Sequence, residues 1–194
     1  ILSRPISINK VDGNNVDFLY HVVGEGTELL SQLKSGDAIG LEGPYGNGFP
    51  IAEGKIALVG GGIGIAPLLY CAQELTGCDV YLGFSREPFQ TEEFRSHADK
   101  LTVDVGGLIL DSVDFMEYDH VFVCGPHPML KAAQLKSIAA RLAGSNTNVY
   151  LSMENRMACG IGACLVCSVS CRDGQRKACT DGPVFLAEEV VFHD

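Results

Sequence analysis

The chain has 194 residues, 46% of them hydrophobic and 20% charged, and its formal net charge at pH 7 is −10. This composition is typical of a globular protein that buries a sizeable core in one large or two small domains. The acidic balance argues against nucleic acids and anionic membranes as partners. The eight cysteines, with no recognisable secretion signal, predict a reducing, cytoplasmic compartment in which thiols bind metal or pack in cores.

Residues 1–52 have the pattern of β structure with one short helix. Polar–apolar alternation predicts strands over residues 2–9, 15–23 and 38–42, and an amphipathic helix over residues 28–33. Three strands are too few for an independent β domain, and the sequence begins without Met in a strand-like stretch. We therefore expect an N-terminally incomplete β-barrel domain over residues 1–52, completed by further strands or by another chain.

Residues 53–147 alternate strand-like and helix-like segments, the pattern of a parallel sheet with crossover helices. The predicted strands cover residues 55–59, 79–84, 101–105 and 121–123, and a further strand over residues 148–151 begins the next part. The predicted helices cover residues 66–75, 91–98 and 128–142. Residues 106–118 fit neither pattern. The alternation predicts an open α/β sheet of parallel strands.

In residues 148–194 glycine and cysteine replace regular periodicity, which predicts a small metal-binding module. The first three cysteines follow the C-x4-C-x2-C spacing of plant-type iron–sulfur proteins, and the fourth expected ligand comes later in the chain. The expected ligands of a 2Fe–2S cluster are Cys159, Cys164, Cys167 and Cys179. Small residues such as Gly160 and Gly162 allow backbone N–H groups to approach the anionic cluster.

Other interpretations of these cysteines are less favoured. Disulfides do not suit a reducing compartment, and zinc ribbons usually pair two C-x2-C knuckles, of which only Cys164 and Cys167 form one. Cys171 is a fifth thiol within the segment. It is only four residues from Cys167 and less able to close the loop from the far side, so we expect Cys179 to be the fourth ligand.

A glycine-rich turn follows the predicted strand over residues 55–59 and opens a helix. Its glycines, which let the backbone approach a pyrophosphate at the helix N-terminus, are Gly60, Gly61, Gly62 and Gly64. The strict G-x-G-x-x-G register is not met, but the strand–turn–helix context favours nucleotide binding over a merely tight turn. Arg86 lies where an acidic residue would favour NAD, so NAD and NADP both stay open on this evidence.

Cys124 and Gly125 follow the predicted strand over residues 121–123, at the edge where open α/β sheets bind ligands. Taken alone, a buried cysteine before a turn is the commoner interpretation of this pattern.

The chain carries a series of motifs in a recognisable order: R-P-x-S, G-x-G-T, G-P-x-G-N-G-F, G-G-G-I-G-x-A-P-L, C-G-P-x-P-M-L, M-A-C-G-I-G-A-C-x-x-C and C-x-D-G-P-V-F. Together they resemble the iron–sulfur flavoprotein electron-transfer subunits of NAD-dependent (type B) dihydroorotate dehydrogenase, within the ferredoxin reductase-like family. The resemblance implies a fold of class α/β plus β. It would comprise a partial β-barrel FAD domain (1–52), a Rossmann-like NAD domain (53–147) and a 2Fe–2S module (148–194).

The resemblance also implies roles for individual residues. Residues expected to bind FAD are Arg4, Pro5, Ile6, Ser7, Gly26 and Thr27. The glycine-rich turn would bind NAD, and Cys124 and Gly125 would lie near the nicotinamide and flavin rings, with Cys124 as the catalytic candidate. In the wider family an aromatic residue often stands at the position of Ile6.

The implied function is electron transfer in pyrimidine biosynthesis. Electrons would pass from an FMN-containing catalytic subunit through the 2Fe–2S cluster and FAD to NAD, within a heterotetramer. One alternative is a related subunit that serves a different partner, such as a ferredoxin–NAD(P) reductase or a sulfide dehydrogenase. A second alternative is a zinc-binding interaction module.

Overall fold

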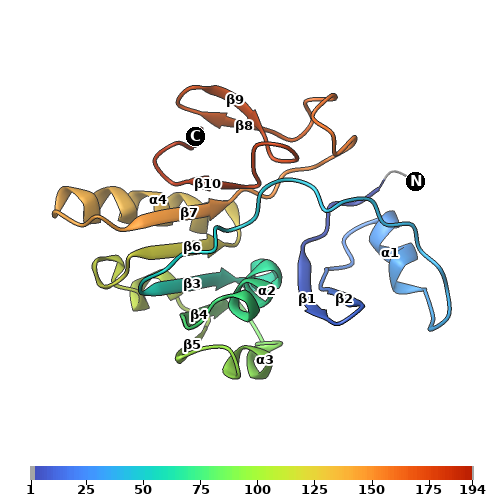
Figure 1. The fold of residues 1–194 in the computed structure, drawn as a ribbon, viewed down its shortest axis with the longest axis horizontal. Coiled ribbons are helices and arrows are strands. Elements are labelled where there is room, and N and C mark those ends of the chain that lie inside the picture. Colours follow the sequence, from blue (N-terminus) through green and yellow to red (C-terminus); the bar gives the residue numbers. More distant parts are fainter. Residues whose placement is uncertain (1–2, 194) are drawn as a thin grey trace.

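A six-stranded sheet forms the centre of the structure, a computed structural model that describes residues 3–193. Figure 1 shows its strands in the order β10-β7-β6-β3-β4-β5. They are β3 (Ile56–Gly61), β4 (Asp79–Phe84), β5 (Lys100–Val105), β6 (His120–Cys124), β7 (Asn148–Ser152) and β10 (Val184–Leu186). All pair in parallel except β10, which runs antiparallel to β7. The predicted α/β fold with a parallel sheet is confirmed.

Helices pack on both faces of this sheet. The α-helices are α2 (Ala66–Glu74), α3 (Thr91–Arg95) and α4 (His127–Leu142), and the 3-10 helices are η1 (Gly62–Ile65), η2 (Ile109–Ser112) and η3 (Phe115–Glu117). Successive side chains of a strand point to opposite faces, so Leu58 joins the core beside α2 whereas Val59 joins the core beside α4. Burial on both faces explains the continuous apolar sequence of β3.

Two details of this region differ from the sequence prediction. The helix predicted over residues 91–98 is too long, because α3 ends at Arg95. Beyond it the amide of Asp99 donates to the carbonyl of Cys78 at 2.8 Å, which directs the chain into β5. Residues 106–118, which fitted neither pattern, contain η2 and η3.

The predicted N-terminal hairpin forms, but its strands have other limits. β1 (Ile8–Asp12) and β2 (Asn15–Phe18) pair antiparallel, and the strands predicted over residues 2–9 and 15–23 are therefore wrong in their limits. The strand predicted over residues 38–42 does not form. Alternation identifies strand-like residues, but a strand exists only where a partner supplies the backbone hydrogen bonds. The hairpin packs against α2, where the amide of Val11 donates to Gln73 Oε1 at 3.3 Å.

Helix α1 (Glu25–Ser31) begins three residues before the predicted helix and ends two residues before it. Thr27 explains the early start. Its hydroxyl accepts hydrogen bonds from the amides of Val23 and Gly24 at 3.0 and 3.2 Å, and it donates to the carbonyl of Gly24 at 2.9 Å. These bonds fix the turn from which the helix starts.

The cysteine-rich segment lies between β7 and β10, which are neighbours in the central sheet. It folds around a small antiparallel hairpin, β8 (Ser168–Cys171) and β9 (Gly174–Lys177), above the β10 edge of the sheet in Figure 1. The segment therefore leaves the sheet and rejoins it at one edge. Across residues 3–193, no helix has both the length and the apolar character that crossing a bilayer requires.

Candidate functional site

The glycine-rich turn after β3 packs directly against the turn that follows β6. A Cβ on Gly61 would lie 2.5 Å from Met129 Sδ, and one on Gly64 would lie 2.5 Å from the carbonyl oxygen of Cys124. These glycines are therefore required by packing within the protein. Gly62 differs, because it has a φ of +54° and an added Cβ would meet nothing within 4 Å. Its backbone is open to close approach by a ligand at the carboxyl edge of the sheet.

The register of the sheet brings Cys124 to this turn. Gly60 and Cys124 are partners in the parallel ladder between β3 and β6. A Cβ on Gly125 would lie 3.3 Å from the Cα of Gly61, so the two turns fit together closely. Burial raises the pKa of the Cys124 thiol, and the nearby carboxylate of Glu154 raises it further. Cys124 is therefore a neutral thiol at physiological pH.

Glu154 is a functional candidate that the sequence did not single out. The Cys124 thiol donates to Glu154 Oε1 across 3.8 Å. Glu154 is exposed when its whole surface is considered, but its carboxyl group is surrounded by protein atoms. This local burial raises the pKa of Glu154. A signal was available, because an acidic residue follows β7 at the carboxyl edge where α/β sheets bind ligands.

Two of the segments predicted to bind FAD meet in space. The guanidinium group of Arg4 lies against the first turn of α1, where a Cβ on Gly26 would be 2.7 Å from Arg4 Nε. Thr27 is buried at the same turn. The other predicted residues lie in irregular chain before β1, with Ile6 half-buried and with Pro5 and Ser7 exposed.

Cys159 lies in a loop whose backbone amides face its sulfur. The amide of Cys164 donates to Cys159 Sγ at 3.4 Å, and the amides of Ile161 and Ala163 also contribute. These donors, Cys164 first among them, lower the pKa of Cys159 to about 6. The loop therefore stabilises a thiolate, the form in which cysteine binds metal.

Positive φ values shape this loop. They occur at Gly160 (+68°), Gly162 (+78°) and the non-glycine Leu165 (+59°). Left-handed conformations are disfavoured for leucine, so the strain at Leu165 is maintained by the surrounding fold. On the inner side of the loop the ammonium group of Lys177 donates to the carbonyl of Gly162 at 3.4 Å.

The β8–β9 hairpin brings two further cysteines together. Ser168 and Lys177 are partners in the hairpin, and Cys167 comes directly before this pair. Cys179 follows shortly after it, and the sulfurs of Cys167 and Cys179 lie 3.3 Å apart. Two of the predicted ligands are thus adjacent in space although they are twelve residues apart.

Cys171 lies at the other end of the same hairpin, where it pairs with Gly174. Cys171 is three positions after Ser168, which corresponds to about 10 Å along the strand at the usual rise per residue. Burial raises the pKa of Cys171, as it does that of Cys179, so the two thiols differ in their position in the hairpin and not in this respect. Its place at the far end of the hairpin is what separates Cys171 from the pair formed by Cys167 and Cys179.

The donor groups suit an iron–sulfur cluster bound by four thiolates. In the described part of the chain no three Cys, His, Asp or Glu side chains converge into a closed metal site. What the segment provides is a sulfur pair, a thiolate-stabilising loop and amide N–H groups directed at sulfur. These are the features that thiolate ligation and tuning of a cluster require. The assignment of the four ligands stays a prediction.

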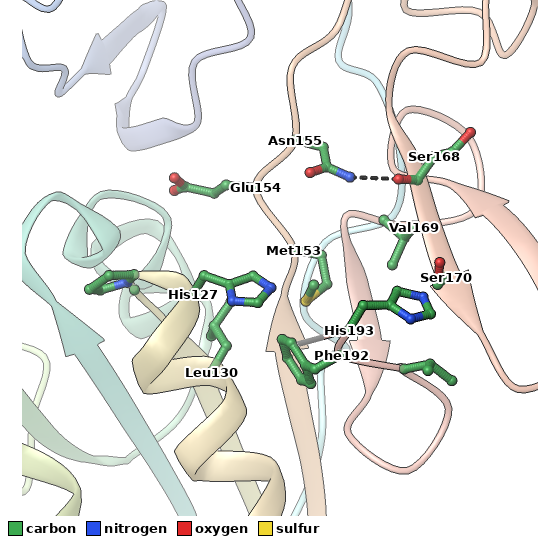
Figure 2. Close-up of a pocket in the computed structure, with 13 residues that line it drawn as sticks. His127, Leu130, Met153, Glu154, Asn155, Ser168, Val169, Ser170, Phe192 and His193 are labelled. Carbon is green, nitrogen blue, oxygen red and sulfur yellow. Dashed lines mark hydrogen bonds between the residues drawn. The ribbon is translucent and has the colours of Figure 1, made fainter.

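A pocket of about 330 Å³ lies between the start of α4 and the cysteine-rich segment. Figure 2 shows His127 and Leu130 of α4 on one wall and Ser168, Val169 and Ser170 of β8 on the opposite wall. Its lining also includes Gly125 and Glu154. The pocket therefore links the predicted nicotinamide region to the cysteine-rich segment.

One family of known domains matches the cysteine-rich segment. Residues 154–191 match the family described as the iron-sulfur cluster binding domain of dihydroorotate dehydrogenase B. This match favours iron–sulfur over zinc for the cysteine-rich segment.

Two curated relatives are both named dihydroorotate dehydrogenase B (NAD(+)), electron transfer subunit. The one from Clostridium acetobutylicum is 44% identical, and the alignment covers 100% of this chain and 81% of the relative. The one from Caldanaerobacter subterraneus subsp. tengcongensis is 46% identical, with coverage of 98% and 81%. The similarity thus extends over the whole chain.

A solved structure of an NADH-dependent reduced ferredoxin-NADP oxidoreductase, studied for flavin-based electron bifurcation, contains a chain of similar fold. Its TM-score is 0.83 at 29% sequence identity, and the match covers 96% of this chain and 73% of that chain.

Proposed function

The chain belongs to the electron transfer subunits of dihydroorotate dehydrogenase B, and from this premise we propose how its three parts share the transfer of electrons. It is an oxidoreductase subunit whose cofactors are a 2Fe–2S cluster, FAD and NAD, and it works with a catalytic partner subunit in pyrimidine biosynthesis. The catalytic partner oxidises dihydroorotate, and this chain passes the electrons on to NAD. Residues 1–52 would bind FAD, residues 53–147 NAD, and residues 148–194 the cluster.

The cysteine-rich segment carries this proposal. Within the matched residues 154–191, amide N–H groups stabilise the thiolate of Cys159, and the sulfurs of Cys167 and Cys179 lie 3.3 Å apart. Cys164 would complete the ligand set. Cys171 lies at the other end of the β8–β9 hairpin, where it pairs with Gly174.

Nicotinamide would bind at the carboxyl edge of the sheet. Gly62 offers backbone that a pyrophosphate can approach closely, and η1 and α2 begin there. The neutral, buried thiol of Cys124 would contact the nicotinamide and flavin rings, with Glu154 behind it. Arg86 is exposed after β4, where it would face the adenosine end of the nucleotide.

Flavin would lie between the nicotinamide site and the cluster. The contact between Arg4 and Gly26 brings a guanidinium group and the first turn of α1 together, a suitable arrangement for a pyrophosphate. When bound, FAD accepts or donates electrons singly or in pairs, which links one-electron cluster chemistry to hydride transfer.

The partner subunit would dock on the cluster loop. Ile161, Leu165 and Val166 expose 67%, 62% and 52% of their surface on this loop. Exposed apolar side chains that gather on one loop are typical of a surface that a second protein covers. We propose that the partner contains FMN and that two copies of each subunit form a heterotetramer.

The test is reconstitution with and without a catalytic subunit. We expect the isolated chain to show the absorption and EPR signals of a 2Fe–2S protein and, when supplied with FAD, to pass electrons from NADH to the flavin. It should oxidise dihydroorotate only in the complex, with equal amounts of orotate and NADH formed. Oxidation of dihydroorotate by the isolated chain would refute the assignment as an electron transfer subunit.

The similarity to a ferredoxin-NADP oxidoreductase chain supports one alternative, in which this chain serves a different redox partner. A complex that reduces ferredoxin but forms no orotate would favour it.

A further inference from the structure

Residues 43–50 form a segment that crosses from the N-terminal part to the central sheet, and we call it the crossing segment. Figure 1 shows it running from the side of α1 past the start of β10 before the chain enters β3. Asn47 makes a bridge to Pro183, directly before β10. The crossing segment thus touches the cysteine-rich segment on its way between the proposed flavin and nicotinamide regions.

Tyr45 of the crossing segment covers the residue that follows Cys159. A Cβ on Gly160 would lie 2.6 Å from Tyr45 Cε2 and 2.9 Å from Tyr45 Cδ2. Gly160 is itself buried. The aromatic ring therefore rests on the backbone of the cluster loop at its first turn, and a side chain at Gly160 would displace it.

Asn47 holds the residues that follow Cys179. Its side-chain amide donates to the carbonyl of Thr180 at 3.0 Å. Its backbone amide donates to the carbonyl of Gly182, and its own carbonyl accepts from the amide of Val184. Together these bonds fix the chain on the far side of the proposed cluster.

The crossing segment is anchored at its other end as well. The ring of Phe49 stacks on that of Phe122 in β6, with ring centres 4.9 Å apart and planes 15° apart. The positions of Tyr45 and Asn47 are therefore set by the same sheet that presents Cys124 at its carboxyl edge.

We propose that Tyr45 and Asn47 are positioning residues for the iron–sulfur cluster. They hold the residues that directly follow the first and last proposed ligands, namely Gly160 after Cys159 and Thr180 after Cys179. In this way they fix the cluster relative to the flavin and nicotinamide sites. This inference rests on the proposed function and deepens it, because it names the residues that set the distance across which electrons pass.

The experiment compares Tyr45→Ala, Tyr45→Phe and Asn47→Ala in the complete complex with its catalytic subunit. Iron content and NADH-dependent flavin reduction should match the wild type in all three. Tyr45→Ala and Asn47→Ala should shift the EPR spectrum of the reduced cluster and slow electron transfer between cluster and flavin in single turnovers. The slowing should be severalfold, because the rate of electron transfer between two cofactors falls steeply as the distance between them grows. Tyr45→Phe, which keeps the ring, should behave as the wild type.

A double-variant cycle tests the contact itself. Gly160→Ala places a methyl group against the Tyr45 ring, and its φ of +68° adds strain. Combining it with Tyr45→Ala should relieve the contact but not the strain, so the EPR shift of the double variant should be smaller than the sum of the two single shifts. An additive shift would refute a direct contact.

Two results would overturn the proposal while leaving the proposed function intact. One is a wild-type EPR spectrum and transfer rate in both Tyr45→Ala and Asn47→Ala. The other is a slower electron transfer between cluster and flavin that is fully explained by loss of iron from the variant. If the wild-type complex itself shows no 2Fe–2S signal, the cluster assignment fails, and this proposal fails with it.

Discussion

The sulfur of Cys124 lies 3.8 Å from a carboxylate oxygen of Glu154, although thirty positions separate the two residues in the chain. Cys124 ends β6 and Glu154 follows β7, so the parallel pairing of these neighbouring strands brings both to the same edge of the sheet. A buried thiol and a carboxylate with a raised pKa thus meet beside the glycine-rich turn.

We predict that Glu154→Gln slows the reduction of flavin by NADH about tenfold, the effect of losing roughly 1.4 kcal/mol of transition-state stabilisation. Hydride donation develops positive charge on the nicotinamide ring, and a nearby carboxylate would stabilise it. Burial raises the pKa of Glu154, so this carboxylate becomes protonated at a higher pH than an exposed glutamate does. As the pH is lowered, the wild-type rate should therefore begin to fall at that higher pH.

Stopped-flow measurements across pH test this prediction. The rate of the Gln variant should not depend on this ionisation, and Glu154→Asp, which keeps the charge, should retain the pH dependence. Identical pH profiles for the wild type and Glu154→Gln would contradict it.

A second prediction concerns the fourth ligand. Cys179→Ser should lose most of the iron, because its sulfur lies 3.3 Å from that of Cys167. Cys171→Ser should keep the iron, because Cys171 lies at the far end of the hairpin. Iron analysis and absorption spectra of the two variants, purified side by side, measure this. The assignment is wrong if iron is retained in Cys179→Ser and lost in Cys171→Ser.

We further predict that Lys177→Gln lowers the midpoint potential of the cluster. Reduction adds negative charge, and the ammonium group of Lys177 lies 3.4 Å from the carbonyl of Gly162 in the cluster loop. Removing a positive charge at this position disfavours the reduced state. A redox titration monitored by EPR measures the shift, with Lys177→Arg as the charge-preserving control. An unchanged potential in Lys177→Gln would show that solvent screens this charge completely.

The docking surface yields a fourth prediction. Leu165→Glu should weaken binding of the catalytic subunit by roughly 2 kcal/mol or more, about thirtyfold, because it would bury an unpaired charge. Flavin reduction by NADH in the isolated chain should not change. Leu135→Glu is a matched control, because Leu135 is similarly exposed but lies on α4. Equal loss of affinity in both variants would place the interface elsewhere.

Much of this protein follows from local sequence. The alternation of strand and helix, the glycine-rich turn and the cysteine spacing each depend on residues close together in the chain, and they sufficed to predict the parallel sheet and the family. The motifs around Cys159 and Cys179 also indicated iron–sulfur chemistry, which the match over residues 154–191 supports.

Other features depend on which distant segments pair, and this the sequence pattern does not specify. Residues 38–42 alternate like a strand but find no partner, whereas the register of β8 with β9 places Cys167 beside Cys179 and Cys171 away from both. The contacts of Glu154 with Cys124 and of Tyr45 with Gly160 arise in the same way. Local periodicity determines which face of an element is buried, but hydrogen-bond registry and side-chain packing between segments decide which residues meet.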